Sequence, residues 1–163
     1  MTLSWTEVQA MAERAALGAK VPFAQAARFG AAAARHIAEG RTAKALVDVL
    51  NDPEQIIALS TEVERAVESA SSLGRSHLIL QEPRELAASF FQSLPCDAKL
   101  ELLPEGLKAT VLLNDPQRRR RVTHLDVPDD LWMQMEALAT GTHLPHGEMS
   151  PKRGVGAGLM QLD

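Results

Sequence analysis

Residues 98–127 read AKLELLPEGLKATVLLNDPQRRRRVTHLDV, and this stretch decides the class of the fold. It contains three runs typical of β-strands, at Ala98–Leu103, Leu107–Leu113 and Arg119–Val127. Apolar and polar side chains alternate within the second and third runs, as expected for strands with one buried face. Two short turns separate the runs, Pro104-Glu105-Gly106 and Asn114-Asp115-Pro116. Because turns this short join antiparallel neighbours, we predict a small antiparallel meander.

Helical patterns fill the chain before this stretch. Ser4 and Glu7 have the spacing of a capping box, so we predict that a first helix begins there. Gly18 suits the left-handed residue that ends many helices. Pro22 suits the first turn of a second helix that continues to Gly40. The apolar face of the first helix is formed by Trp5, Val8, Met11, Ala12 and Ala15.

Further elements follow on both sides of the predicted sheet. We predict a helix over 42–50 and a second helix that begins at Asp52-Pro53 and stops at 69–74. A short strand follows at His77–Leu80, and another helix runs from Pro83 to about 94–95. A last helix follows Asp126–Asp129 and carries Leu131, Trp132, Met135, Leu138 and Ala139. Helices, a small sheet, a helix and a glycine-rich tail in this order predict an α+β fold with a mainly helical N-terminal half. We expect one domain over residues 1–163, with a subdivision near 69–74 as the alternative and the tail at 147–163.

Small residues form a stripe along the predicted second helix, at Ala26, Ala27, Gly30, Ala31 and Ala34. Such a stripe lets another backbone come close, and helical stripes usually mark packing surfaces. We therefore predict a tight hairpin of the first two helices.

Composition and charge restrict the classes of function. The net charge of -4 argues against general affinity for nucleic acid, which requires clustered positive charge. No apolar run approaches the ~18 residues of a membrane span, and no signal peptide opens the chain. The single cysteine, Cys96, excludes an internal disulfide, and we expect it to be a small semi-buried residue. From these features we expect a cytoplasmic protein. We expect it to bind neither a membrane nor a nucleic acid.

The C-terminal segment holds the candidate ligands. His143, His146 and Glu148 offer two imidazoles and a carboxylate, and Arg153 offers a cation for a small anion. Zinc needs three or four ligands in fixed geometry, so we expect neither a metal nor another cofactor. Gly154, Gly156 and Gly158 resemble a phosphate loop, but no helix can begin after Leu159 to complete one. We predict instead that 154–159 is ordered and packs closely on the body or on a second subunit.

Other polar residues give no catalytic set. We expect Arg118–Arg121 to be a solvated, charged edge of a hairpin, because alternate side chains of a strand point in opposite directions. His36 lies near Arg35 and Glu39, and we expect it to be exposed. No serine, histidine and acid appear with a nucleophile turn. The sequence leaves open whether the protein is an enzyme.

Both ends of the chain carry residues that resemble those of a known family. They are Leu3-Ser4, Glu7-Val8, Ala15-Ala16, Gly18-Ala19, Pro22 and Gly30 at the start, and Thr142, Leu144-Pro145, Ser150, Arg153-Gly154 and Gly156-Ala157-Gly158-Leu159 at the close. These residues resemble the bacterial family called domain of unknown function 3726, whose members look like cytoplasmic single-domain proteins. His143, His146-Gly147-Glu148 and the final residues 160–163 depart from the family's pattern. The resemblance implies one domain and a meaningful tail, but no reaction.

Two functions remain in view. The first is a non-catalytic accessory or interaction protein, a homodimer beside a metabolic enzyme, which the small-residue surface favours. The second is a protein that binds a small anion or a metal, or a minor enzyme, through residues 143–153.

Overall fold

The computed structural model describes residues 1–141, which form helices packed on one another and on two small antiparallel sheets. The elements in chain order are β1 (Thr2–Ser4), α1 (Trp5–Gly18), α2 (Phe23–Ala38), α3 (Ala43–Asn51), α4 (Pro53–Leu73), β2 (Arg75–Leu80), α5 (Arg84–Gln92), β3 (Cys96–Leu103), β4 (Gly106–Pro116), β5 (His124–Asp126) and α6 (Asp129–Thr140). The predicted α+β class is confirmed.

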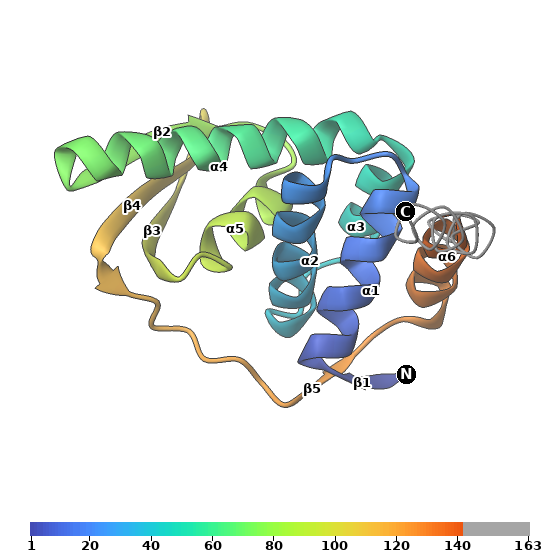
Figure 1. The fold of residues 1–163 in the computed structure, drawn as a ribbon. Helices are drawn as coiled ribbons and strands as arrows, with labels where there is room; N and C mark the ends of the chain where they lie inside the picture. Colours follow the sequence, from blue (N-terminus) through green and yellow to red (C-terminus); the bar gives the residue numbers. More distant parts are fainter. Residues whose placement is uncertain (142–163) are drawn as a thin grey trace, which may run out of the picture.

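The helices and the larger sheet occupy different parts of the molecule (Figure 1). Helices α1 and α2 lie side by side, and α6 packs along the outer side of α1. The larger sheet has the strand order β2-β4-β3, and α4 and α5 cover one of its faces. The opposite face presents side chains that are exposed: His77, Ile79, Lys99 and Glu101.

A capping box opens α1, as predicted. The Ser4 hydroxyl accepts a hydrogen bond from the Glu7 amide at 3.3 Å, and the Glu7 carboxylate accepts one from the Ser4 amide at 2.8 Å. The predicted role of Gly18 is wrong. Gly18 is the last residue of α1, and Lys20 takes the left-handed conformation with φ of 71°. A glycine is needed at position 18 for a steric reason, because the backbone of α6 lies against it.

The predicted hairpin of α1 and α2 is present, and the small-residue stripe forms its contact. A β-carbon built at Gly30 would lie 2.6 Å from the carbonyl oxygen of Gln9, which is closer than real side chains approach. Ala26 and Ala34 are fully buried, whereas Ala27 and Ala31 are only half-buried. The stripe is therefore a packing surface on its buried side.

Helix α4 continues past the predicted stop at 69–74. Ser69 and Leu73 both belong to the helix, and only Gly74, with φ of 80°, ends it. Serine lowers helix stability slightly but does not end a helix that is packed on its neighbours. The helix contacts both α2 and β2, so it joins the helical layer to the sheet.

The third strand of the predicted meander is in a different place. Of Arg119–Val127, only His124–Asp126 forms a strand, and β5 pairs with β1 instead of β4. Residues 117–123 leave the end of β4 and cross the molecule to reach β5 beside β1, as Figure 1 shows. Arg35 holds this segment, because its guanidinium donates to the carbonyl oxygens of Arg119 at 3.3 Å and Arg120 at 3.2 Å. These backbone groups thus bond to a side chain and have no strand partner.

No helix within residues 1–141 combines the length and the apolar character needed to cross a lipid bilayer.

Candidate functional site

The candidate ligands predicted in the C-terminal segment lie outside the described residues. They are His143, His146, Glu148, Arg153, Gly154, Gly156 and Gly158. His124 is exposed on β5. Within residues 1–141, no group of three or more histidine, cysteine or acidic side chains is placed to hold a metal ion. Two other places on the molecule have the geometry of a binding site.

The first place is a groove between α1 and α6, which we call the α1–α6 groove. One hollow in it has a volume of about 480 Å³ and is lined by Met11 and Arg14 on α1 and by Met133, Glu136, Ala137, Ala139 and Thr140 on α6. A second hollow of about 330 Å³ shares Met11 and Arg14 and extends to Thr6, Glu7, Ala10 and Trp132. The two hollows therefore make one continuous groove along α1.

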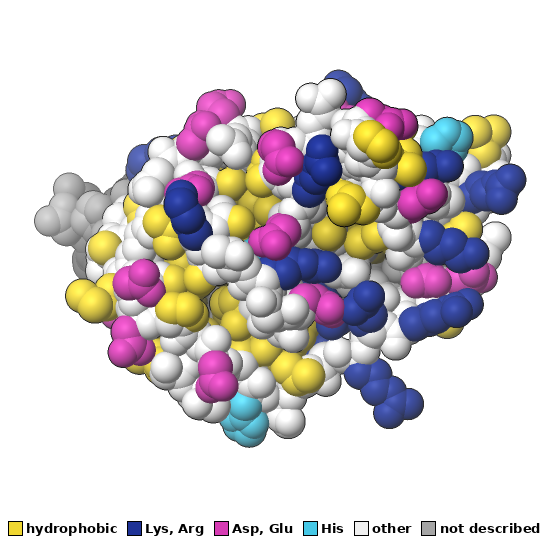
Figure 2. Space-filling view, turned by 180° about the vertical axis from the view of Figure 1, so that it is seen from behind, with side chains coloured by type: hydrophobic (Ala, Val, Ile, Leu, Met, Phe, Trp, Pro, Cys, Tyr) yellow, Lys and Arg dark blue, Asp and Glu magenta, His cyan; other side chains and the backbone are white. Residues whose placement is uncertain are grey.

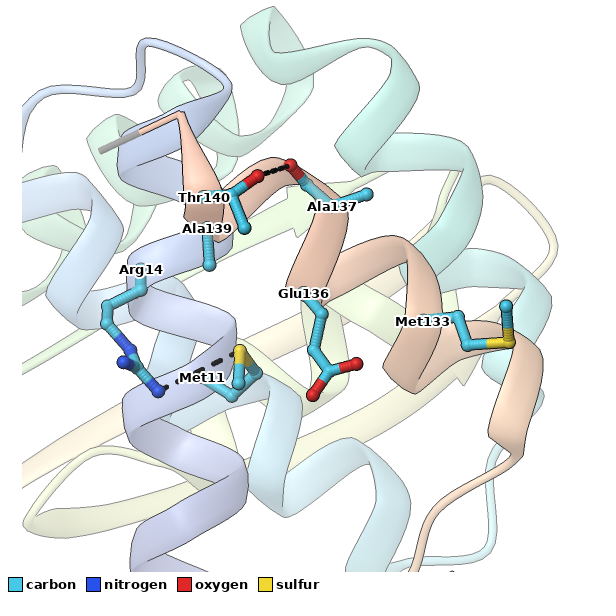
Figure 3. A pocket seen from close by; sticks show the side chains of 7 residues that line it. All are labelled: Met11, Arg14, Met133, Glu136, Ala137, Ala139 and Thr140. Carbon is cyan, nitrogen blue, oxygen red and sulfur yellow. Dashed lines mark hydrogen bonds between the residues drawn. The ribbon is translucent and has the colours of Figure 1, made fainter. Parts of the chain in front are cut away.

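Two opposite charges stand on the two walls of the α1–α6 groove. Figure 3 shows Arg14 extending from α1 and Glu136 from α6, on either side of Met11. Arg14 contacts the Met11 sulfur at 3.9 Å. Among residues 1–141, neither Arg14 nor Glu136 forms an ion pair. Met133 is 67% exposed, so the groove combines unpaired charge with accessible apolar surface.

The second place is a cavity of about 300 Å³ where the start of α1, the middle of α2, the end of α5 and residues 117–121 meet. We call it the arginine cavity. Its lining includes three arginines, Arg35, Arg119 and Arg121, together with Trp5, Gln9, Ala31, Gln92, Ser93, Leu94, Pro95 and Gln117. The Arg35 guanidinium carbon lies 4.9 Å from the centre of the Trp5 ring, and that of Arg121 lies 5.7 Å from it. The cavity is thus a cationic site with an aromatic wall.

Positive charge exceeds negative charge at the arginine cavity. Glu39 is the carboxylate that pairs with Arg119, at 2.6 Å, and with Arg35, at 3.5 Å. Arg121 has no carboxylate partner among the described residues. Burial lowers the pKa of the Arg35 guanidinium, Glu39 raises it, and the neighbouring charges of Arg119 and Arg121 lower it again. The net lowering reflects a charge that is desolvated and crowded by like charges.

Two buried polar atoms at the wall of the arginine cavity have no hydrogen-bond partner among the described residues. They are Nε of Arg35 and Oε1 of Gln92, in side chains that are 5% and 6% exposed. Both atoms are almost inaccessible to solvent, so their missing hydrogen bonds are a cost of folding at this wall. The neighbouring Gln117 is paired, since its amide donates to the carbonyl oxygens of Gln92 at 2.7 Å and Leu94 at 3.1 Å.

His36 is buried, so the prediction that it is exposed is wrong. Its Nε2 lies 2.9 Å from the Thr42 carbonyl oxygen and its Nδ1 lies 2.8 Å from the Ser89 hydroxyl. A carbonyl accepts only, so Nε2 carries a proton in its bond to Thr42. Arg41 also donates to the Ser89 hydroxyl, at 2.8 Å. The sequence could not show this, because His36 binds a residue of α5 that is 53 positions away.

The Ser89 and His36 pair resembles a nucleophile with its base, but it is sealed inside the protein. Both residues are 0% exposed, so no substrate reaches the hydroxyl. Burial lowers the pKa of His36, which favours the neutral form. The pair therefore joins α2, α3 and α5 as part of the core. Cys96, which we expected to be semi-buried, is buried, and burial raises the pKa of its thiol, which disfavours the reactive thiolate.

Basic side chains gather on one part of the face drawn in Figure 2. In Figure 2 most lysine and arginine side chains gather on the side where the three-stranded sheet lies, whereas hydrophobic side chains are more evident toward the helices. Most of the run Arg118–Arg121 has a partner. Arg118 pairs with Asp97 at 3.4 Å, Arg119 pairs with Glu39, and Arg121 lies against Trp5. All four arginines are exposed, so the run is solvated as predicted, but it does not form the edge of a hairpin, because it folds back onto α1 and α2.

Comparisons of this chain with protein-family models, with curated proteins and with solved structures found no match.

Proposed function

We propose that this protein is a non-catalytic accessory or interaction protein that works as a homodimer, with the α1–α6 groove as the contact between the two copies. The observation that carries the proposal is the pair of unpaired opposite charges, Arg14 and Glu136, on the two walls of one groove. In a twofold dimer, if residue i contacts residue j of the second copy, then j contacts i. Arg14 of each copy therefore faces Glu136 of the other.

The residue types along the groove support an interface. Aromatic residues, methionine and arginine are enriched where proteins bind one another, and this groove holds Trp132, Met133 and Arg14. Methionine adapts its shape easily, which suits a contact between two identical surfaces. Burying Met133 and pairing the two charges would provide both apolar contact and orientation.

The geometry of the described residues favours binding over chemistry. The one serine and histidine in direct contact, Ser89 and His36, are both fully buried, and the Cys96 thiol is also buried. The lone reduced cysteine is consistent with a cytoplasmic protein. The residues at the two ends of the chain support a place among the bacterial proteins called domain of unknown function 3726 as part of the same proposal.

A charge-reversal series tests the homodimer. Molar mass is measured by light scattering during gel filtration for the wild-type protein and for Arg14→Glu, Glu136→Arg and the double variant. Each single reversal places like charges opposite each other and is expected to weaken dimerisation at least about tenfold, whereas the double reversal restores it.

Two apolar variants complete the series. Met133→Glu is expected to give a monomer, and Leu102→Glu, which alters a similarly exposed side chain on β3, is expected to leave the dimer intact. A monomeric wild-type protein at micromolar concentration contradicts the proposal, as does a dimer that both single reversals leave unchanged.

The alternative function is a protein that binds a small anion or a metal, or a minor enzyme, through residues 143–153. A thermal-shift screen of divalent metals and anionic metabolites distinguishes it, because a ligand that binds the folded state raises the melting temperature. Stabilisation that is lost in His143→Ala would favour this alternative.

A further inference from the structure

The arginine cavity is lined by residues from segments that are far apart in the sequence. Trp5 and Gln9 come from α1, Arg35 from α2, Gln92 from the last turn of α5, and Arg119 and Arg121 from the segment that leaves β4. Its volume of about 300 Å³ matches the smaller pockets that hold metabolites. A cavity of this size admits a small molecule rather than a folded domain.

The charges at the arginine cavity are arranged to receive an anion. Three guanidinium groups line it and one carboxylate, Glu39, opposes them, so positive charge stays uncompensated among the described residues. Arg119 is 48% exposed, which leaves its guanidinium accessible to a ligand. Arg121 is held against Trp5 and has no carboxylate partner within residues 1–141. Guanidinium groups bind carboxylates and phosphates through paired hydrogen bonds, which makes these two anions the fitting class.

Arg35 adds a buried charge to the same wall. The residue is 5% exposed and lines the cavity. Its carboxylate partner, Glu39, lies 3.5 Å away and also pairs with Arg119. The buried guanidinium therefore shares its one counter-charge within residues 1–141 with a second arginine.

We infer that the arginine cavity is a binding site for a small organic anion, a metabolite with a carboxylate or phosphate group. Arg121 and Arg119 bind the anionic group, and Arg35 provides the buried charge behind them. Glu39 competes with the ligand for Arg119, so its carboxylate sets how tightly the anion binds. The site lies away from the α1–α6 groove and shares no lining residue with it.

Isothermal titration calorimetry at constant ionic strength tests this site, with inorganic phosphate, succinate and citrate as probes. Saturable binding of at least one probe at one site per chain is expected. Arg121→Gln is expected to weaken binding at least about tenfold, because it removes hydrogen bonds to a charged group. Glu39→Gln is expected to tighten binding several-fold, because it frees Arg119.

The matched control is Arg120→Gln. It removes the same charge from the next position, but the Arg120 side chain does not line the cavity, so affinity is expected to change less than twofold. Thermal unfolding of each variant without ligand distinguishes lost binding from lost folding. Trp5 fluorescence in a Trp132→Phe background gives a second readout, because Trp5 is then the only tryptophan.

Three outcomes overturn the inference. One is the absence of saturable binding by every probe at millimolar concentration. Another is an equal loss of affinity in Arg121→Gln and Arg120→Gln, which indicates nonspecific attraction by the arginine run. The third is a preference for a polyanion such as heparin over all small probes, which indicates a macromolecular ligand. None of these outcomes depends on whether the protein forms a dimer.

Discussion

Gly18 at the end of α1 lies against the backbone of Leu138 in α6, and a β-carbon at position 18 would be 1.9 Å from the Leu138 carbonyl oxygen. No side chain other than hydrogen fits at that distance. The two helices therefore approach through their backbones near the C-terminal end of each. The same approach holds together the walls of the α1–α6 groove.

Gly18→Ala is expected to destabilise the fold, because the added methyl group meets backbone atoms that cannot move alone. The free energy of unfolding should fall by about 1–3 kcal/mol, as for other overpacked contacts. Urea denaturation measures the change. Gly40→Asn provides the contrast, since Gly40 has φ of 67° and open space around it, and asparagine tolerates that conformation. Equal stability losses at the two positions would contradict the steric account.

Ala34→Leu is expected to cost about 1–3 kcal/mol of unfolding free energy, because Ala34 is fully buried in α2 and has no room for a larger side chain. Thermal unfolding provides the measurement. Ala24→Leu makes the same change at an exposed position in the first turn of α2 and should have little effect. An Ala34→Leu protein as stable as the wild type would remove the support for a close-packed hairpin.

The stability of the protein is expected to fall as the pH is lowered through the range where His36 titrates. Burial lowers the pKa of His36 below its ordinary value of 6.5. The unfolded chain therefore takes up a proton near pH 6.5 while the folded chain does not. The contribution of neutral His36 to the free energy of unfolding is complete above pH 6.5. Below pH 6.5 it falls by up to ~1.4 kcal/mol per pH unit, until His36 is protonated in the folded state as well.

Urea titrations between pH 5 and pH 8 check this dependence. His36→Gln should lower stability at pH 8 but give a flatter profile below pH 6.5. His77→Gln alters an exposed histidine on β2 and should keep the wild-type profile. A wild-type slope that persists in His36→Gln would assign the dependence to other groups.

Arg35→Lys is expected to loosen residues 117–126 while keeping the charge. Arg35 donates to two carbonyl oxygens of that segment, and a lysine has no planar fork to span both. Hydrogen exchange of the β5 amides should become faster, and unfolding free energy should fall by about 1–3 kcal/mol. Arg28→Gln on the same helix removes a more exposed ion pair and should leave exchange in β5 unchanged.

No salt-dependent binding of RNA or DNA is expected in a physiological buffer. The net charge is -4, and two arginines of the run, Arg118 and Arg119, pair with Asp97 and Glu39. Fluorescence anisotropy with labelled oligonucleotides at two salt concentrations measures this. Micromolar affinity with a steep salt slope, abolished by replacing the four arginines, would contradict the prediction.

Local signals in the sequence predicted the helices well. The capping box at Ser4 and Glu7, the proline before α5 and the alternation in β4 each depend on residues a few positions apart. Such signals are read directly from neighbouring residues. The ends of helices were harder, because Gly18 is required by α6, which is distant in the sequence.

The sites were less predictable than the fold, because long-range contacts create them. Arg35 looks like a surface arginine beside Glu39 until residues 117–121 fold over it. His36 looks exposed until Ser89 arrives from α5. The available signal was the run of four alanines at 31–34, directly before Arg35 and His36. Such a run of small residues indicates that this part of α2 is closely packed. The predicted ligands of the C-terminal segment lie outside the described residues, and their roles stay predictions.

The pairing of β1 with β5 has a consequence for the order of folding. Thr2 bonds Asp126 at 2.8 Å, although 124 positions separate them. Closing so long a loop costs conformational entropy. The three residue pairs of β1 and β5 do not offset that cost until the chain between them is compact. Neighbouring helices such as α1 and α2 close much shorter loops. We therefore expect the hairpin of α1 and α2 to form early and the β1–β5 ribbon to close last.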